Sequence, residues 1–434
     1  MKRIEYYNIN DPEEKVSLRT AVLKGIAGYR GLYMPDHIPV MDPDFFKKLP
    51  GMTLQEISFE VSRKFLTGSV PDDAILEIVN RSFNFPIPLV QLGKRLHVLE
   101  LFHGPTLAFK DVGARFMAAL FEYLLRGENR EATVLVATSG DTGSAAASAF
   151  YKSQGIRVVI LYPSGRVSKL QEKMLTSIGE NVIAIEVEGD FDDCQRLVKE
   201  AFIDPKLISV LNLTSANSIN FARLLPQTFY YFHAAAQIKT GKSPLAISVP
   251  SGNFGNLTAG LFAWKMGLDI GHFIASSNAN HSFADYLKTG QYKPKPSVHT
   301  ITTAMDVGDP SNFPRLLKIF NGEHSKIRSL IDGCWFTDKE TSDAMKELYE
   351  KYGYLADPHG AVAYLGLKKY MEDHDVCGIF LETAHPSKFE SDVESATGRK
   401  VIIPDSLNDL LRAEGRSVKI NASFMELKRL LLHS

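Results

Sequence analysis

Short runs of β-branched residues alternate with longer amphipathic segments from about residue 100 onward, and this alternation restricts the possible folds more than any other feature of the chain. Runs of this kind are typical of buried strands, whereas the segments between them have helical spacing. Strands that alternate with helices form βαβ units, whose strands lie parallel in one sheet. We therefore predict an α/β fold with open parallel sheets.

The alternating region contains four predicted strands and five predicted helices. The strands are Thr133–Ala137, Arg157–Tyr162, Asn181–Val187 and Leu245–Val249, and the helices are 111–126, 143–153, 167–178, 191–202 and 217–238. In the first helix, Val112, Phe116 and Tyr123 share one face. Residues 1–95 mix proline-punctuated loops with helical stretches, and residues 391–434 are predicted to form a charged helical segment.

The charge balance excludes two classes of protein. With 49 Lys and Arg against 50 Asp and Glu, the 434-residue chain has a net charge of −1. Nucleic-acid-binding proteins have basic surfaces, and acidic disordered chains have excess carboxylate and few aromatic residues. No apolar run is long enough to span a membrane, and the 3 cysteines have no metal-binding or disulfide spacing. We therefore expect a cytoplasmic protein with no metal and no nucleic-acid or membrane partner.

Two glycine-containing loops follow predicted strands, at the edge where parallel sheets bind ligands. They are Thr138-Ser-Gly-Asp-Thr-Gly143 and Pro250-Ser-Gly-Asn-Phe-Gly-Asn256, and each opens a helix. Free backbone N–H groups at a helix start bind anions. Neither spacing matches a nucleotide-binding motif. A phosphate site is favoured at the second loop, whereas a tight capped turn explains the first loop equally well.

Lys110 stands in an unusual setting within the segment Phe102-His-Gly-Pro-Thr-Leu-Ala-Phe-Lys-Asp111. Most lysines lie in solvent, but this one follows apolar residues and precedes Asp111, a predicted N-cap. Desolvation lowers a lysine pKa and frees the amine to act as a nucleophile or to form a Schiff base. A reactive lysine beside a phosphate loop on an α/β sheet indicates pyridoxal 5′-phosphate as cofactor.

Six motifs occur together in one order. They are His103-Gly-Pro-Thr-Leu-Ala-Phe-Lys-Asp111, Ala137-Thr-Ser-Gly-Asp-Thr-Gly-Ser144, Leu161-Tyr-Pro-Ser-Gly165, Asn217-Ser-Ile-Asn-Phe-Ala-Arg223, Ser248-Val-Pro-Ser-Gly-Asn-Phe-Gly-Asn256 and Glu382-Thr-Ala-His-Pro-Ser-Lys-Phe389. In this order they resemble the bacterial and fungal branch of the threonine synthase family, a fold-type II class of pyridoxal-phosphate enzymes similar to tryptophan synthase β. The resemblance begins near Tyr29 and covers most of the chain.

This resemblance implies two open parallel-sheet domains and a mixed, largely helical N-terminal domain. The implied boundaries are 1–95 for the N-terminal domain, 96–130 and 223–390 for a large cofactor-binding domain, 131–222 for a smaller inserted domain and 391–434 for the C-terminal helical segment. The chain thus enters the large domain, leaves it for the smaller one and then returns.

The family's site residues carry over onto matching positions. Lys110 would be the catalytic lysine that binds the cofactor covalently, and Thr383 would meet the pyridine nitrogen. The cofactor phosphate would be held by Gly252, Asn253, Phe254, Gly255 and Asn256. The substrate carboxylate would be bound by Thr138, Ser139, Asp141 and Thr142, and the substrate phosphate by Asn217, Ser218, Asn220 and Arg223. Lys169 and Arg115 are further phosphate candidates.

Asp141 occupies a position where many enzymes of the wider class have asparagine, so the resemblance leaves its protonation state open. The activity implied is a carbon–oxygen lyase reaction in which O-phospho-L-homoserine and water give L-threonine and phosphate. A serine or threonine dehydratase of the same class and a non-catalytic relative that binds small molecules are the alternatives. A monomer, or a weak homodimer, is expected.

Overall fold

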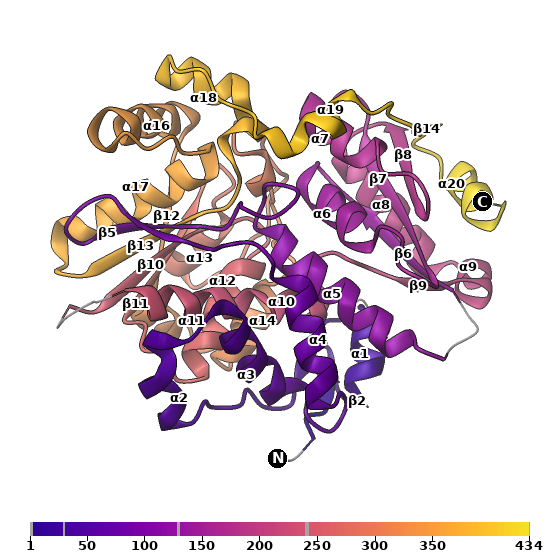
Figure 1. Cartoon of the computed structure of the whole chain (residues 1–434), viewed down its shortest axis with the longest axis horizontal. Helices are drawn as coiled ribbons and strands as arrows, with labels where there is room; N and C mark the ends of the chain where they lie inside the picture. The colour runs from indigo at the N-terminus through magenta and orange to yellow at the C-terminus, as the bar shows by residue number, and fades with distance from the viewer. Residues whose placement is uncertain (1–2, 29–30, 128–130, 239–242, 434) are drawn as a thin grey trace.

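Two sheets of mainly parallel strands organise the chain, as the resemblance implied (Figure 1). The structure is a computed structural model that describes residues 3–28, 31–127, 131–238 and 243–433. Tyr29 and Arg30, where the resemblance begins, lie outside the described residues. None of the helices in the described ranges combines the length and the apolar composition that crossing a membrane requires.

The larger sheet contains six strands, of which five run parallel. In spatial order they are β12 (Ile331–Trp335), β11 (His272–Ser277), β10 (Leu245–Pro250), β13 (Cys377–Glu382), β5 (Leu96–Glu100) and β4 (Leu89–Gln91). Only the edge strand β4 is antiparallel to its neighbour. Every residue of β10 and β13 is buried, as expected for parallel strands covered on both faces. Their carboxyl ends therefore meet at one edge of the sheet.

Helices cover both faces of this sheet. Alternate residues of β10 point to opposite faces, so Ile247 packs in one hydrophobic cluster and Ala246 in another. The first cluster includes α5 (Lys110–Leu125), α11 (Gln227–Gln237) and α12 (Gly255–Lys265), and the second includes α16 (Asp338–Tyr352) and α17 (Pro358–Asp373). Shorter helices complete this part of the chain: α13 (Ser282–Thr289), α14 (Phe313–Ile319) and α15 (His324–Leu330).

The smaller sheet has five strands, all paired in parallel. Their order is β14 (Val418–Asn421), β8 (Val182–Glu188), β7 (Ile156–Pro163), β6 (Ala132–Ala137) and β9 (Asn212–Thr214). The helices between them are α6 (Asp141–Phe150), α7 (Lys169–Thr176), α8 (Phe191–Ile203) and α9 (Pro205–Val210). The four strands predicted from β-branched runs are thus found within two residues of their expected ends, and the α/β fold class is confirmed.

Two local predictions differ from the structure. The helix expected over 217–238 is divided into α10 (Phe221–Leu224) and α11, with Pro226 between them. Proline has no N–H to continue a helix and clashes with the preceding turn. The tail contains the expected helices α18 (Glu390–Thr397), α19 (Asn408–Arg412) and α20 (Phe424–His433), but it also contributes β14 to the smaller sheet. The predicted helical segment thus also contains a strand that the sequence did not indicate.

The N-terminal part packs beneath both sheets in the view of Figure 1. It has a small antiparallel sheet, β2-β1-β3, formed by Asp11–Val16, Tyr6–Asn8 and Tyr33–Pro35. Its helices are α1 (Leu18–Lys24), α2 (Pro43–Lys48), α3 (Leu54–Leu66) and α4 (Asp72–Ser82). Helix α3 packs on α11 and helix α4 on α5, within one continuous hydrophobic cluster. Strand β4 lies within residues 1–95 but pairs with β5 of the larger sheet. The domain boundary at residue 95 remains a prediction.

The C-terminal segment stabilises the smaller sheet through buried leucines of α20. In Figure 1 it passes from α18 across α7 to α20. Leu427 is fully buried in the cluster of the smaller sheet, whereas Met425 of the same helix is 72% exposed.

Leu427→Ala should lower the free energy of unfolding by about 2–5 kcal/mol, because it leaves a cavity. Met425→Ala should change it by less than about 0.5 kcal/mol. Urea unfolding followed by circular dichroism measures both; equal effects would contradict this packing.

Candidate active site

The loop that ends at Lys110 runs alongside the chain that leaves β13. Leu101 N–H donates to the Glu382 carbonyl at 3.0 Å, and Phe109 N–H donates to the Thr383 carbonyl at 2.8 Å. Lys110 is the first residue of α5. These backbone hydrogen bonds therefore place the amine-bearing residue beside Thr383, at the carboxyl edge of the larger sheet.

Asp111 does not cap α5 as predicted. The helix begins one residue earlier, with Phe109 at the N-cap position, and Asp111 lies in the first turn. Its buried carboxylate accepts hydrogen bonds from Thr106 N–H at 2.8 Å and from the Thr106 hydroxyl at 2.7 Å. Burial raises the pKa of Asp111. The side chain thus closes the turn before Lys110, in which Leu107 adopts a left-handed φ of 56°.

Asp141 and two lysines form a buried charge cluster. The Asp141 carboxylate lies 3.5 Å from Lys110 Nζ and 2.7 Å from Lys388 Nζ. Gln171 Nε2 donates to the same carboxylate at 2.9 Å. Asp141 begins α6 beside the smaller sheet, whereas both lysines belong to segments at the larger sheet. The charges of this cluster therefore bridge the two sheets.

The cluster determines the charge of its members. Burial lowers the pKa of Lys110, and the positive charges of Lys388 and Arg223 lower it further against the opposing effect of Asp141. Burial alone would raise the pKa of Asp141, but Lys388, Lys110 and Gln171 together hold it well below its usual range. Asp141 is therefore a carboxylate, and Lys110 releases its proton more readily than an ordinary lysine.

The loop after β10 has the properties of a phosphate cradle. Phe254 has a left-handed φ of 59° and precedes the first residue of α12, Gly255. A Cβ on Gly252 would lie 2.9 Å from Met305 Cα, so the backbone there leaves no space for a side chain. Asn256 Oδ1 accepts hydrogen bonds from two tyrosine hydroxyls, and its buried Nδ2 has no partner among the residues that the structure describes. An unpartnered donor at a helix start fits the phosphate of pyridoxal phosphate.

The other residues predicted to contact the cofactor lie near this cradle or near Lys110. The Thr383 side chain is buried, and its hydroxyl has no hydrogen-bond partner among the described residues. This leaves it available to a pyridine nitrogen. Asn253 instead turns toward the neighbouring loop, where its Oδ1 accepts from Ser311 N–H at 3.1 Å. The backbone N–H groups of the loop remain the better candidates at that position.

The 138–143 loop is shaped by its own threonine. The buried hydroxyl of Thr138 accepts hydrogen bonds from Gly140 N–H at 2.9 Å and from Gly143 N–H at 2.8 Å. Ser139 and Thr142 are half-buried on either side of the α6 start. The structure therefore places Asp141 in the charge cluster, with Ser139 and Thr142 close to it along the chain, whereas the Thr138 hydroxyl organises the loop.

The residues predicted to bind the substrate phosphate are divided between two roles. Asn220 has a structural role, because its side-chain amide caps α10 and donates a hydrogen bond to the Val22 carbonyl at 2.9 Å. Ser218 lies against the phosphate cradle, where a Cβ on Gly255 would be 3.2 Å from Ser218 Cβ. Arg223 donates to the Ala216 carbonyl at 2.9 Å, and burial lowers its pKa to about 10. The Oδ1 atom of Asn217 is buried, and none of the described residues donates a hydrogen bond to it.

The two further candidates differ in position. Arg115 donates to the backbone carbonyls of Ser82 and Arg81, both at 2.8 Å, at the end of α4. These bonds anchor α5 to the N-terminal part, so Arg115 has a structural role. Lys169 is exposed at the first residue of α7, where nothing holds its amine in the charge cluster.

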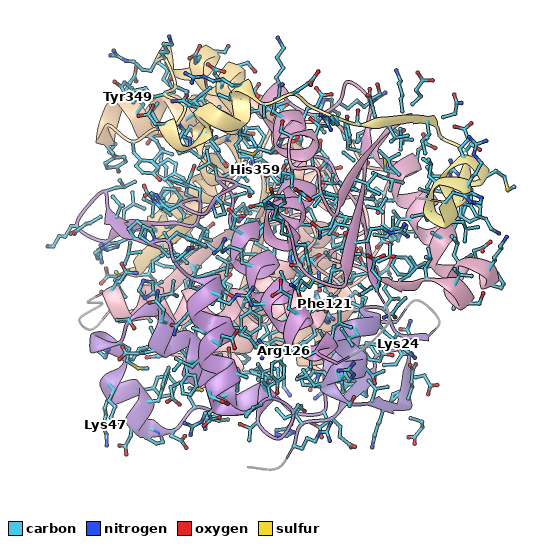
Figure 2. All side chains as sticks on the ribbon, turned by 45° about the vertical axis from the view of Figure 1, so that its right-hand side comes forward. Lys24, Lys47, Phe121, Arg126, Tyr349 and His359 are labelled. Carbon is cyan, nitrogen blue, oxygen red and sulfur yellow. The ribbon has the colours of Figure 1, made fainter. Side chains whose placement is uncertain are left out.

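Three residues outside the predicted site set help to organise the site. Arg315 is fully buried and donates to the carbonyls of Ser218 at 3.3 Å and Ile219 at 2.6 Å, which holds the 217–220 segment. His359, which is labelled in Figure 2, is buried and accepts from Ala304 N–H at 3.2 Å, next to Gly252. Lys388 lies in the motif Glu382–Phe389, and its place in that motif was the one feature of the sequence that could have indicated a role in the site.

Three family models together match almost the whole chain. The threonine synthase N terminus model matches residues 5–83, the pyridoxal-phosphate dependent enzyme model matches 84–381, and the threonine synthase C-terminal model matches 360–431. The threonine synthase of Haemophilus influenzae is 44% identical over 429 residues, which cover 99% of both chains. The chain belongs to the threonine synthase family.

Solved structures of this family have the same fold. The crystal structure of threonine synthase from Escherichia coli has a TM-score of 0.93 and 40% identity, with 99% of both chains covered. A pyridoxal-phosphate-bound threonine synthase from Brucella melitensis has a TM-score of 0.93 and 34% identity over 99% of both chains. The family predicted from the motifs, and with it the class of pyridoxal-phosphate enzymes, is confirmed.

The lack of space at Gly252 makes a testable prediction about the cradle. Gly252→Ala should weaken cofactor binding by about tenfold or more, because the added methyl group meets the backbone of Met305 and overpacking costs about 1–3 kcal/mol. Gly51→Ala is the matched control, since a Cβ at Gly51 has nothing within 4 Å. Titration of cofactor-free protein with pyridoxal phosphate, followed by visible absorbance, measures both affinities. Unchanged affinity in Gly252→Ala would place the cofactor phosphate elsewhere.

Proposed function

We propose that this chain converts O-phospho-L-homoserine and water into L-threonine and phosphate with pyridoxal phosphate as cofactor. The observation that carries the proposal is the full-length similarity to proteins named threonine synthase, with 44% identity to one of them. The chemistry of the site agrees, because Lys110, whose side chain is 15% exposed, and the phosphate cradle lie at one sheet edge, and Ser218 lies against that cradle.

The proposed cofactor site uses residues from three strand ends. Lys110 binds the cofactor covalently, the 252–256 loop holds its phosphate, and the Thr383 hydroxyl meets the pyridine nitrogen. The cofactor, when bound, withdraws electrons from the substrate carbon next to the amino group. A hydroxyl partner stabilises a protonated pyridine nitrogen less than a carboxylate does. More of the proton chemistry therefore depends on Lys110 itself.

The proposed substrate site has two anion-binding parts. Ser139, Thr142 and the N–H groups at the start of α6 receive the carboxylate. Ser218 and Arg223, with Asn217 beside them, receive the phosphate, because a guanidinium binds phosphate in bidentate fashion. Asp141 would repel a substrate carboxylate by itself. Its ion pair with Lys388 offsets that repulsion.

Lys110 moves the protons in this proposal. Its lowered pKa leaves the amine free to accept the proton from Cα and then one from Cβ. Phosphate leaves from Cγ. Lys110 returns one proton to Cγ, which becomes a methyl group, and one to Cα, while water adds its hydroxyl group at Cβ and its remaining proton passes to the released phosphate. Water must stay out until phosphate has left. Motion of the smaller-sheet domain over the larger one would control its entry, since Asp141 contacts Lys110 and Lys388 across that boundary.

Phosphate release separates this reaction from the alternatives. Purified protein given O-phospho-L-homoserine should release phosphate and form threonine, whereas a serine or threonine dehydratase would release ammonia from serine or threonine. A non-catalytic binding relative would do neither. Absence of phosphate release by cofactor-loaded protein would overturn the proposal.

The lysine assignment predicts a large loss of turnover. Lys110→Ala should lower the rate of phosphate release by at least about a thousandfold, because the proton carrier is removed. Its circular dichroism spectrum should match that of the unchanged protein. Lys368→Ala, at an exposed ion pair with Glu347, should keep full turnover. Borohydride should attach the cofactor to Lys110, and attachment to another lysine would contradict the assignment.

The arginine assignment predicts a substrate-dependent effect. Arg223→Ala should raise the KM for O-phospho-L-homoserine by about ten- to hundredfold, the cost of a lost charge-assisted hydrogen bond. It should weaken inhibition by L-homoserine, which has no phosphate, by much less. Arg196→Ala, at an exposed ion pair of α8, serves as the control for lost positive charge. Equal effects on both ligands would place Arg223 outside the phosphate site.

We also propose that the protein acts in the cytoplasm as a monomer or a weak homodimer. All proposed site residues come from one chain, and its described cysteines are free thiols. Sedimentation at several protein concentrations tests the oligomeric state.

A further inference from the structure

Lys388 is buried far more deeply than lysines normally are. Its side chain has no exposed surface, and no other lysine in the described ranges is classed as buried. An isolated ammonium group is costly to bury, so its partners explain its presence. Nζ donates to the Thr106 carbonyl at 2.8 Å and lies 2.7 Å from Asp141 Oδ1.

The Asp141 carboxylate separates Lys388 from Lys110. Its Oδ1 atom contacts Lys388 and accepts from Gln171, whereas its Oδ2 atom faces Lys110 Nζ at 3.5 Å. Thr106, which accepts from Lys388, also bonds the Asp111 carboxylate that closes the turn before Lys110. Lys388 therefore touches the turn that carries Lys110 and the carboxylate that Lys110 faces.

We propose that Lys388 is a positioning residue of this active site, whose ammonium group holds the Asp141 carboxylate turned toward Lys110 and offsets part of its negative charge. The inference rests on the proposed function for its catalytic meaning. Lys388 does not contact the reacting atoms in this assignment; it acts through Asp141.

The charges around Lys110 determine whether loss of Lys388 favours or disfavours protonation of the Lys110 nitrogen. The groups that face the cluster are Asp141 from α6, Arg223 from α10, Lys388 and His385 from the segment after β13, and Asp111 from α5. Asp141 favours a protonated nitrogen on Lys110, and Lys388 disfavours it. Removal of the Lys388 charge therefore favours protonation of that nitrogen.

A purely structural role would have different consequences. Lys388 belongs to the segment Pro386–Phe389 at the larger sheet, and Asp141 begins a helix of the smaller sheet. If the ion pair only joins the two parts, its loss lowers the melting temperature and leaves the titration of Lys110 unchanged. A pH titration of Lys110 therefore distinguishes the positioning role from the purely structural role.

The experiment compares three cofactor-loaded variants. In Lys388→Met, the pH at which the visible absorbance of the bound cofactor changes should rise by about one unit, because a neighbouring positive charge is lost. The acidic limb of the kcat/KM profile should move in the same direction. Lys388→Arg keeps the charge and should stay close to the unchanged protein. Lys428→Met breaks an ion pair of similar length, 2.6 Å to Asp204, away from the site, and should shift neither.

Asp141→Asn keeps the inference testable if Lys388→Met does not fold. This variant removes the negative charge at nearly constant volume, so the same absorbance change should move to lower pH. An unchanged titration in Lys388→Met, or in Asp141→Asn, would overturn the inference, even if the melting temperature falls. The absorbance titration needs no substrate. It therefore remains informative if O-phospho-L-homoserine is not converted, a result that would overturn the proposed function alone.

Discussion

Parallel pairing of β10, β13 and β5 is the constraint on which the rest of the structure depends. The register pairs Ser248 with Phe380, and Phe380 with Val98, so the three strands end at the same edge. The phosphate cradle follows the first strand, Thr383 follows the second, and the loop to Lys110 follows the third. Hydrogen bonds between that loop and the chain after β13 then fix the lysine in place. Parallel strands bring such loops together because their carboxyl ends coincide.

The smaller sheet is joined to this edge by the ion pairs of Asp141 with Lys110 and Lys388. Asp141 is nearly fully buried, and a buried carboxylate is stable only if its charge is matched by close partners. Those partners, Lys110 and Lys388, belong to the larger-sheet side, so the charge state of the site and the relative position of the sheets depend on each other. Burial lowers the pKa of Lys110, and the positive charges of Lys388 and Arg223 lower it further, against the opposing effect of Asp141.

Much of the fold followed from local pattern. Short buried runs such as Val134–Val136 are strands because β-branched residues pack well on a covered sheet. The setting of Lys110 was predicted from the apolar residues before it, and the cradle from two glycines at a helix start. Local pattern failed where a distant contact decided the outcome. Asp111 bonds Thr106 instead of capping α5, and residues 418–421 became a strand only because β8 offers a free edge.

The sequence by itself determined the alternation of strands and helices, the glycine loops, the position of Lys110 after an apolar run, and the family. Each of these features depends on residues close together in the sequence, because propensity and spacing act over a few positions. Only the tertiary structure decided that Asp141 is ionised, that Lys388 is its partner and that Arg315 holds the segment around Ser218. The physical reason is that burial and charge pairing join side chains far apart in the chain. Their partners are set by which surfaces pack together.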